Sequence, residues 1–144
     1  AARCSDTSLR PREIGGKVMD KQNLFPACPV ETTLKLIGDK WNVLILRDLF
    51  LGTKRFSELK RSLAGVSQKV LTSQLRGREE AGLVSRAVYP EVPPRVEYSL
   101  TARGRSLRPV IESMWNWGRA FKEDLGLDVA AIPERMPVPA EPRE

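Results

Sequence analysis

Residues 67–76 bring together side chains that could hydrogen-bond a nucleic acid. The group contains one amide, three hydroxyls and two cations and no acidic side chain: Ser67, Gln68, Lys69, Thr72, Ser73 and Arg76. Amides and hydroxyls hydrogen-bond the edges of bases, and cations bind backbone phosphates. The solvated side of an ordinary helix has the same composition, so these residues alone leave both interpretations open.

Such a group needs a helix that is held from its other side. Val70, Leu71 and Leu75 recur at helical spacing and predict an apolar stripe opposite the polar residues. Ser67 precedes this stripe at the position of an N-cap, where its hydroxyl can accept a backbone N–H of the first turn. We therefore expect a helix that begins just after Ser67.

A second, shorter helix is predicted immediately before it. Phe56, Leu59 and Leu63 are spaced by three and four residues and so share one face. Gly65 follows and can adopt the left-handed conformation that ends many helices. Two helices joined by a tight turn of this kind are typical of a helix-turn-helix, which places its second helix in the DNA major groove.

Two strands are predicted after the helix-turn-helix. Leu83–Tyr89 is a β-suited run, and Val96, Tyr98 and Leu100 alternate with polar residues. The proline-rich segment 90–94 between them cannot continue a strand and predicts a loop. A hairpin here is either a wing that contacts DNA or a cover for the core. Arg86 and Arg95, one on each strand, favour contact with a phosphate backbone.

Helices are predicted on both sides of this region. The stripe of Val30, Leu34 and Ile37 indicates a helix that starts near residue 30. The next helix, 40–51, is apolar on nearly all sides and is expected to be the central helix of the core.

The last helix is expected to follow Thr101, its predicted N-cap, and to kink or break at Pro109. Its apolar residues include more large aromatics than one edge of a small domain easily buries. We therefore expect Met114, Trp117 and Phe121 to contact a second subunit. The alternative is that Trp115 and Trp117 both pack internally.

Composition narrows the class of function. The chain of 144 residues carries a net charge of +6 and contains no histidine, which argues against most hydrolases and metalloenzymes. Residues 55–108 hold eleven basic side chains against five acidic ones, a surplus that suits a polyanionic partner. No run is long enough to cross a membrane, so we expect a cytoplasmic protein with no membrane partner. We also expect no cofactor and no bound metal.

The expected organisation is a mobile arm over residues 1–22, one domain over 23–125 and a proline-rich tail over 126–144 that need not fold. The two cysteines, Cys4 and Cys28, provide neither a disulfide framework nor a zinc site. Cys28 precedes a predicted helix start, where the helix dipole favours a thiolate. A cysteine that simply packs in the core is the alternative.

Several motifs, in order along the chain, resemble the HxlR-type winged helix-turn-helix regulators. They are Cys28-Pro29-Val30, Gly38-Asp39-Lys40-Trp41, Arg55-Phe56-Ser57-Glu58-Leu59, Ser67-Gln68-Lys69-Val70-Leu71-Thr72, Gly82-Leu83-Val84-Ser85-Arg86, and Pro93-Pro94-Arg95-Val96-Glu97-Tyr98-Ser99-Leu100-Thr101 with Gly104. The resemblance covers about residues 28–121. It implies an α+β, mostly α fold: a winged helix-turn-helix with a two-stranded β-wing and flanking dimerisation helices.

The resemblance also implies a function. Members of that family are homodimers that bind double-stranded DNA sequence-specifically and regulate nearby genes. Some respond to electrophiles or oxidants through the cysteine matched here by Cys28. The expected partners are therefore a two-fold symmetric operator and a second copy of the chain, with the effector unknown. The chain departs from the family pattern at Gly77 and Arg78, so the second helix of the motif is expected to fray or end early near Arg76.

Two other classes of function are open to a chain of this composition. A winged-helix module that binds an acidic protein instead of DNA would account for the same basic surface. A thiol enzyme acting through Cys28 is disfavoured, because the chain has no histidine to activate the sulfur and no second cysteine at C-x-x-C spacing.

Overall fold

The computed structural model describes residues 25–137, and the chain divides into two compact units, 1–40 and 41–144. The expected arm, 1–22, lies outside the described residues together with Cys4. The described part of the first unit contains α1 (Pro29–Ile37), with Cys28 at its N-cap. Of the predicted stripe on this helix only Ile37 is buried, whereas Val30 and Leu34 are exposed.

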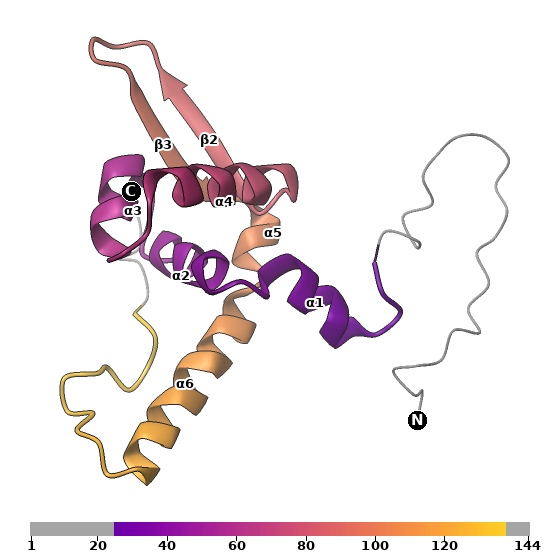
Figure 1. Ribbon diagram of the computed structural model, residues 1–144, viewed down its shortest axis with the longest axis vertical. Helices are drawn as coiled ribbons and strands as arrows, with labels where there is room; N and C mark the ends of the chain where they lie inside the picture. Colours follow the sequence, from indigo (N-terminus) through magenta and orange to yellow (C-terminus); the bar gives the residue numbers. More distant parts are fainter. Residues whose placement is uncertain (1–24, 138–144) are drawn as a thin grey trace, which may run out of the picture. The chain divides into compact units, whose positions relative to one another are not determined.

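The second unit is mostly helical and has a small antiparallel sheet (Figure 1). Its described elements, in chain order, are α2 (Lys40–Leu49, which begins at the boundary), β1 (Lys54–Arg55), α3 (Phe56–Ser62), α4 (Gln68–Glu80), β2 (Val84–Tyr89), β3 (Arg95–Leu100), α5 (Ala102–Arg105) and α6 (Arg108–Asp124). The predicted fold class, a helix-turn-helix followed by a β-hairpin and flanked by helices, is confirmed.

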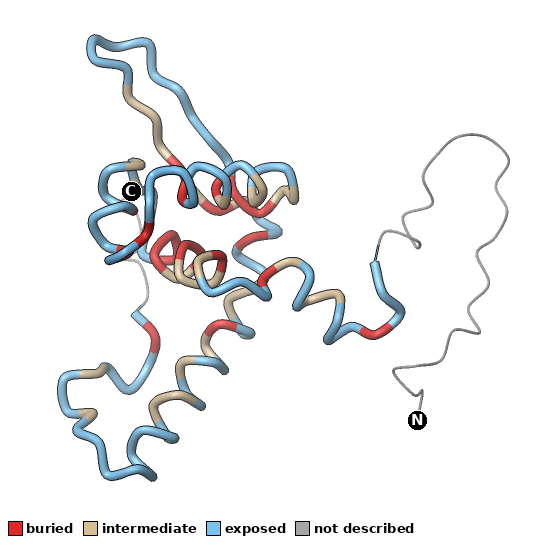
Figure 2. The backbone as a smooth tube through the Cα atoms, in the orientation of Figure 1, coloured by how far each residue is buried: buried red, intermediate tan, exposed pale blue. Residues whose placement is uncertain are grey.

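The core of this unit is built around α2, as the apolar run predicts. Ile45 and Leu46 are fully buried, and the buried faces of α2 and α4 are visible in Figure 2. Asp48 is also buried, but its carboxylate accepts a hydrogen bond from Ser62 Oγ at 2.6 Å and pairs with Arg47 at 2.9 Å. A buried charge is tolerated only when it is satisfied in this way, so Asp48 fastens α2 to the end of α3.

The sheet has three strands in the order β1-β3-β2 rather than the two that the sequence predicts. The hairpin pairs Val84 with Leu100 at its base and Tyr89 with Arg95 at its far end. The additional strand, β1, has two residues and pairs Lys54 with Tyr98. Only the base of β2 is buried, so the hairpin projects beyond the core as a wing (Figures 1 and 2).

Pro109 breaks the last helix, one of the two outcomes expected for it. Thr101 caps α5, and its hydroxyl accepts a hydrogen bond from the Gly104 N–H at 3.1 Å. The chain then turns, and α6 starts anew with Pro109 in its first turn, where the missing N–H has no cost.

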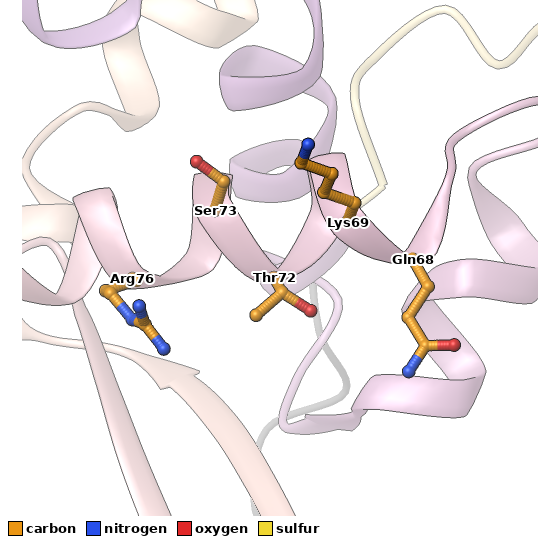
Figure 3. Close-up of a pocket in the computed structure, with 5 residues that line it drawn as sticks. All are labelled: Gln68, Lys69, Thr72, Ser73 and Arg76. Atoms are coloured by element: carbon orange, nitrogen blue, oxygen red, sulfur yellow. The ribbon is translucent and has the colours of Figure 1, made fainter.

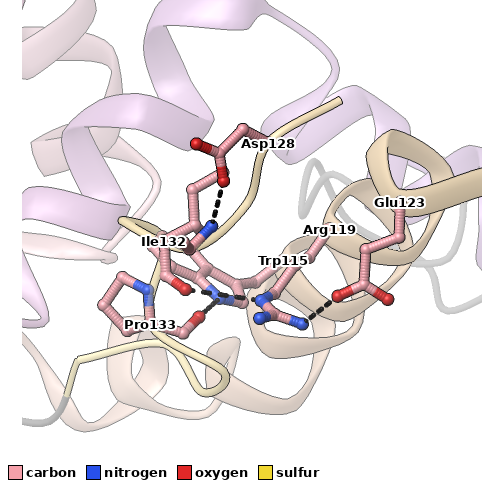
Figure 4. Close-up of polar contacts among 7 residues, drawn as sticks. Trp115, Arg119, Glu123, Asp128, Ile132 and Pro133 are labelled. Carbon is pink, nitrogen blue, oxygen red and sulfur yellow. Dashed lines mark hydrogen bonds and ion pairs between the residues drawn. The ribbon is translucent and has the colours of Figure 1, made fainter. Parts of the chain in front are cut away.

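Within the expected tail, the segment around Ile132 and Pro133 lies against α6 (Figure 4). The indole N–H of Trp115 donates to the Pro133 carbonyl at 3.0 Å, and Arg119 Nε donates to the Ile132 carbonyl at 3.4 Å. Met136 is buried. One tryptophan of α6 therefore packs within the chain and does not remain available to a partner.

The close packing around Gly104 is tested by an alanine substitution there, with the same substitution at Gly118 as its control. A Cβ at Gly104 would overlap the Leu83 carbonyl oxygen and lie 3.1 Å from Leu100 Cδ2, whereas a Cβ at Gly118 in α6 meets nothing within 4 Å. Gly104→Ala is expected to lower the free energy of unfolding by about 2 kcal/mol through overpacking. Gly118→Ala is expected to raise it by up to about 1 kcal/mol through helix propensity. Urea denaturation measures both free energies of unfolding. Equal effects of the two substitutions would contradict the close packing of Gly104 against Leu83 and Leu100.

Candidate nucleic-acid interface

The start of α4 is fixed by local interactions that the sequence predicts. Gly65 has the predicted left-handed conformation, with a φ of 89°, but it lies in the turn two residues beyond Leu63, which is the C-cap of α3. Ser67 is the N-cap, and its Oγ accepts a hydrogen bond from the Val70 N–H at 3.1 Å. This hydrogen bond satisfies one N–H of the first turn. It therefore stabilises the helical conformation of Gln68 and Lys69, the two residues that follow the cap.

Five of the predicted contact residues lie together on α4 and line one shallow, open groove: Gln68, Lys69, Thr72, Ser73 and Arg76. All five are exposed. Figure 3 shows Gln68, Thr72 and Arg76 in line along one side of the helix, with Lys69 and Ser73 along the adjacent side. At about 100° per residue the five span an arc of roughly 140°, which is one face of the helix.

The opposite face is apolar and anchored. Leu71 and Leu75 are fully buried, whereas Val70, the third residue of the predicted stripe, is at the edge and exposed. Because these leucines are buried, the polar side chains that line the groove face the solvent.

The expectation that this helix frays or ends near Arg76 is wrong. The helix α4 continues through Gly77 and Arg78 to Glu80, and Ala81 is its C-cap. Arg78 is only partly exposed, and its carbonyl accepts the Leu83 N–H at 3.0 Å as the chain turns toward β2. The register of the polar face is thus continuous over the whole helix.

The cations of this face are not neutralised by the fold. Within residues 25–137, no carboxylate forms an ion pair with Lys69 or Arg76. Glu79 and Glu80 are the acidic residues of α4, and they lie at its last turn. The first two turns of α4 therefore present positive charge and hydrogen-bonding groups to the solvent.

The two arginines of the wing differ from one another. Arg86 on β2 is exposed. The guanidinium of Arg95 pairs with Glu91 at 3.4 Å and with Glu97 at 3.3 Å, and it stacks over the Tyr89 ring at 4.3 Å. A phosphate would have to displace these carboxylates from Arg95, so Arg86 is the more accessible of the two.

A second groove lies between the start of α3 and the loop of the wing. Arg55 and Ser57 line it from one side, and residues 91–96 line it from the other. Sequence patterns did not identify Arg55 as a contact residue, because its neighbour across the groove is about forty positions away in the chain. Only the general surplus of positive charge over residues 55–108 pointed to it.

The other candidate residues lie away from α4. Met114, Trp117 and Phe121 are on the exposed side of α6, and the Trp117 and Phe121 rings stack with centroids 5.2 Å apart. Cys28 is buried at the N-cap of α1, with its carbonyl accepting the Thr32 N–H at 3.0 Å. It belongs to the first unit, α6 to the second.

Neither a metal site nor a membrane span is found in the part of the chain that the structure describes. Between residues 25 and 137 no three histidine, cysteine or carboxylate side chains are grouped so that they could hold a metal ion. No helix in the same range is both long and apolar enough to cross a membrane.

Residues 36–125 match the family model described as HxlR-like helix-turn-helix. The chain belongs to this family. A protein of Bacillus subtilis strain 168 with the name "uncharacterized HTH-type transcriptional regulator YdeP" is 50% identical to it over 115 residues, which is 80% of this chain and 88% of that one. The HxlR-like chain is thus a member of a family of DNA-binding transcription regulators.

Two solved structures have folds similar to that of this chain. One is a redox regulator in its oxidized form, and the other is a transcriptional regulator in its reduced form. The redox regulator HypR in its oxidized form is 47% identical and superposes with a TM-score of 0.62, over 65% of this chain and 96% of that one. The reduced form of the transcriptional regulator YodB from B. subtilis is 39% identical with a TM-score of 0.59, over 67% and 96%. The shared fold and the level of identity support the placement of this chain in the HxlR-like family.

Proposed function

We propose that this HxlR-like chain is a homodimer that binds a specific, two-fold symmetric DNA operator through α4. The observation that carries the proposal is the groove on α4, where five exposed polar or cationic side chains lie opposite two buried leucines. In this role α4 is the recognition helix. Gln68 and Lys69, at its N-terminal end, face the base edges, and Arg76 and Arg86 hold phosphates.

The wing extends this contact surface. β2 and β3 project away from α4 as a hairpin, with the exposed Arg86 on β2 (Figure 1). Arg55, which lines the groove beside the wing loop, adds a further cation to this surface. A helix in the major groove with a hairpin on the flanking backbone accounts for both the hydrogen-bonding groups of α4 and the positive charge around it.

The homodimer is supported by the apolar row of α6, which we define as the exposed residues Val110, Met114, Trp117, Phe121 and Leu125. Their spacing of four and three residues puts them on one side of the helix. Trp117 is 69% exposed and Phe121 48% exposed. Contiguous large apolar side chains of this kind mark protein contact surfaces, and a second copy of the chain brings the two recognition helices to successive major grooves about 34 Å apart.

The proposal includes a thiol response at Cys28. The cysteine occupies the N-cap of α1, at the positive end of the helix dipole. It is only 4% exposed, so an oxidant reaches it when the segment around Pro29 opens. The similarity to the redox regulator HypR supports this assignment.

The DNA contacts are tested by neutralising the cations of α4. Lys69→Ala and Arg76→Ala are each expected to weaken binding to an operator selected from random-sequence DNA. Arg76→Ala is also expected to reduce the slope of log affinity against log salt by about 0.9, the contribution of one phosphate contact. Lys122→Ala on α6 removes the same charge away from α4 and is expected to leave the slope unchanged. Fluorescence anisotropy at several salt concentrations measures all three, and parental affinity in both α4 variants would contradict the assignment.

The dimer is tested on the apolar row of α6. Trp117→Glu places a charge in the middle of the row and is expected to raise the dimer dissociation constant at least tenfold, because a buried unpaired carboxylate is costly. Asn116→Glu adds the same charge one residue away, on an exposed polar position, and is expected to remain dimeric. Sedimentation velocity distinguishes the two variants. A parent protein that is monomeric at micromolar concentration would contradict the proposed homodimer.

The thiol response is tested by comparing the two cysteines. After a brief pulse of hypochlorite or quinone, the parent and Cys4→Ser are expected to change their operator affinity, whereas Cys28→Ser is expected not to change. Alkylation of Cys28 is expected to be slow in the folded protein and fast in urea, since burial limits access. If Cys28→Ser responds to the pulse as the parent does, Cys28 has a packing role only.

A further inference from the structure

A small hollow of about 240 Å³ lies between elements of the second unit, away from the groove of α4. We call it the Arg105 hollow. The end of α2 contributes Leu49 and Phe50, β3 contributes Leu100, and the start of the C-terminal helices contributes Arg105 and Arg108. The hollow therefore borders the core, the wing and the first turn of α6.

Its walls combine two kinds of chemistry. Leu49, Phe50 and Leu100 belong to the buried core and provide an apolar base. Arg105 and Arg108 provide two guanidinium groups, and no acidic residue is among the lining residues. An apolar base with cations beside it suits a molecule that has a hydrocarbon body and one negatively charged group.

The two arginines are held in place but keep free donors. Arg105 Nη1 donates to the Leu100 carbonyl at 2.8 Å, which fixes its guanidinium over the end of β3. Arg108 uses Nε to pair with Glu112 at 2.6 Å, and its side chain is 33% exposed. A guanidinium has five N–H donors in a fixed plane, so each arginine retains N–H groups that can donate hydrogen bonds to a carboxylate.

We propose that the Arg105 hollow binds a small monocarboxylate with an apolar ring or branched chain, and that this ligand regulates DNA binding. The volume lies below the usual range of roughly 300–1,000 Å³ for ligand pockets, which limits the ligand to about one ring. The carboxylate accepts hydrogen bonds from Arg105 and Arg108, and the hydrocarbon body covers Leu49 and Phe50.

The position of the hollow explains how such a ligand acts on DNA binding. Leu100 ends β3, the strand that pairs with both other strands of the sheet, and Arg108 begins α6. A ligand that contacts both favours one arrangement of the wing relative to α6, and it shifts operator affinity by its preference for that arrangement. This regulatory role rests on the proposed function; the binding site itself does not.

The site is tested by calorimetry on the full chain with four probes: benzoate, cyclohexanecarboxylate, benzyl alcohol and inorganic phosphate. The two carboxylates are expected to bind at least about tenfold more tightly than benzyl alcohol, which lacks the charge, or phosphate, which lacks the hydrocarbon body. The double variant Arg105→Gln/Arg108→Gln is expected to lose this preference. Thr53→Trp, which fills the hollow from an exposed position without changing charge, is expected to abolish binding of both carboxylates.

Arg103→Gln is the matched control, because Arg103 is an exposed arginine of α5 that does not line the hollow. It is expected to bind both carboxylates as the parent does. Carboxylate binding that is absent from the parent, equal to that of benzyl alcohol, or unchanged in Thr53→Trp overturns the site. Operator affinity that is the same with and without saturating benzoate overturns the regulatory role. A parent that binds no DNA refutes the proposed function, while the calorimetry still decides the site.

Discussion

The orientation of α4 depends on the burial of two leucines. Leu71 and Leu75 are fully buried, and each fully buried leucine contributes about 1.5–3 kcal/mol. The glycine in the same helix, Gly77, costs only about 1 kcal/mol relative to alanine, and nothing lies within 4 Å of the Cβ it lacks. Packing therefore outweighs propensity, which is why the helix continues beyond Arg76 and why its polar side faces outward.

Local features of the sequence predicted most of this region. The cap at Ser67, the left-handed Gly65 and the break at Pro109 each depend on a few neighbouring residues, so their chemistry is readable from the chain alone. The periodicity of α4 also identified its buried leucines, and the apolar run of α2 predicted the place of that helix in the core. The fold class and the grouping of the five polar residues on one face of α4 follow from these signals.

Features that depend on distant residues were not predictable in the same way. β1 has two residues and exists because β3 offers it a partner more than forty positions away. The segment around Ile132 and Pro133 is held against α6 by hydrogen bonds such as the one between Trp115 and Pro133, which no periodic pattern in the sequence predicts. Arg95 was expected on phosphate, but the alternation of the strand puts Glu97 on its own side, and the two pair.

The two sides of α6 have different roles in this account. One side is covered by the chain itself, through Trp115 and Arg119, and the other carries the exposed apolar row. A helix covered on one side and apolar on the other has a single surface left for a partner. The intramolecular contact thus limits the choice of dimer interface as well as stabilising the helix.

The central claim is that α4 reads bases from both halves of a symmetric operator. Its most direct test is the base preference of the parent and of Gln68→Ala, each measured by repeated selection from random-sequence DNA and sequencing of the bound pool. If α4 reads bases in this way, Gln68→Ala loses base preference, by roughly tenfold, at two positions related by the two-fold axis, while the rest of the operator is selected as before. An unchanged profile, or a loss at positions without two-fold symmetry, would contradict it.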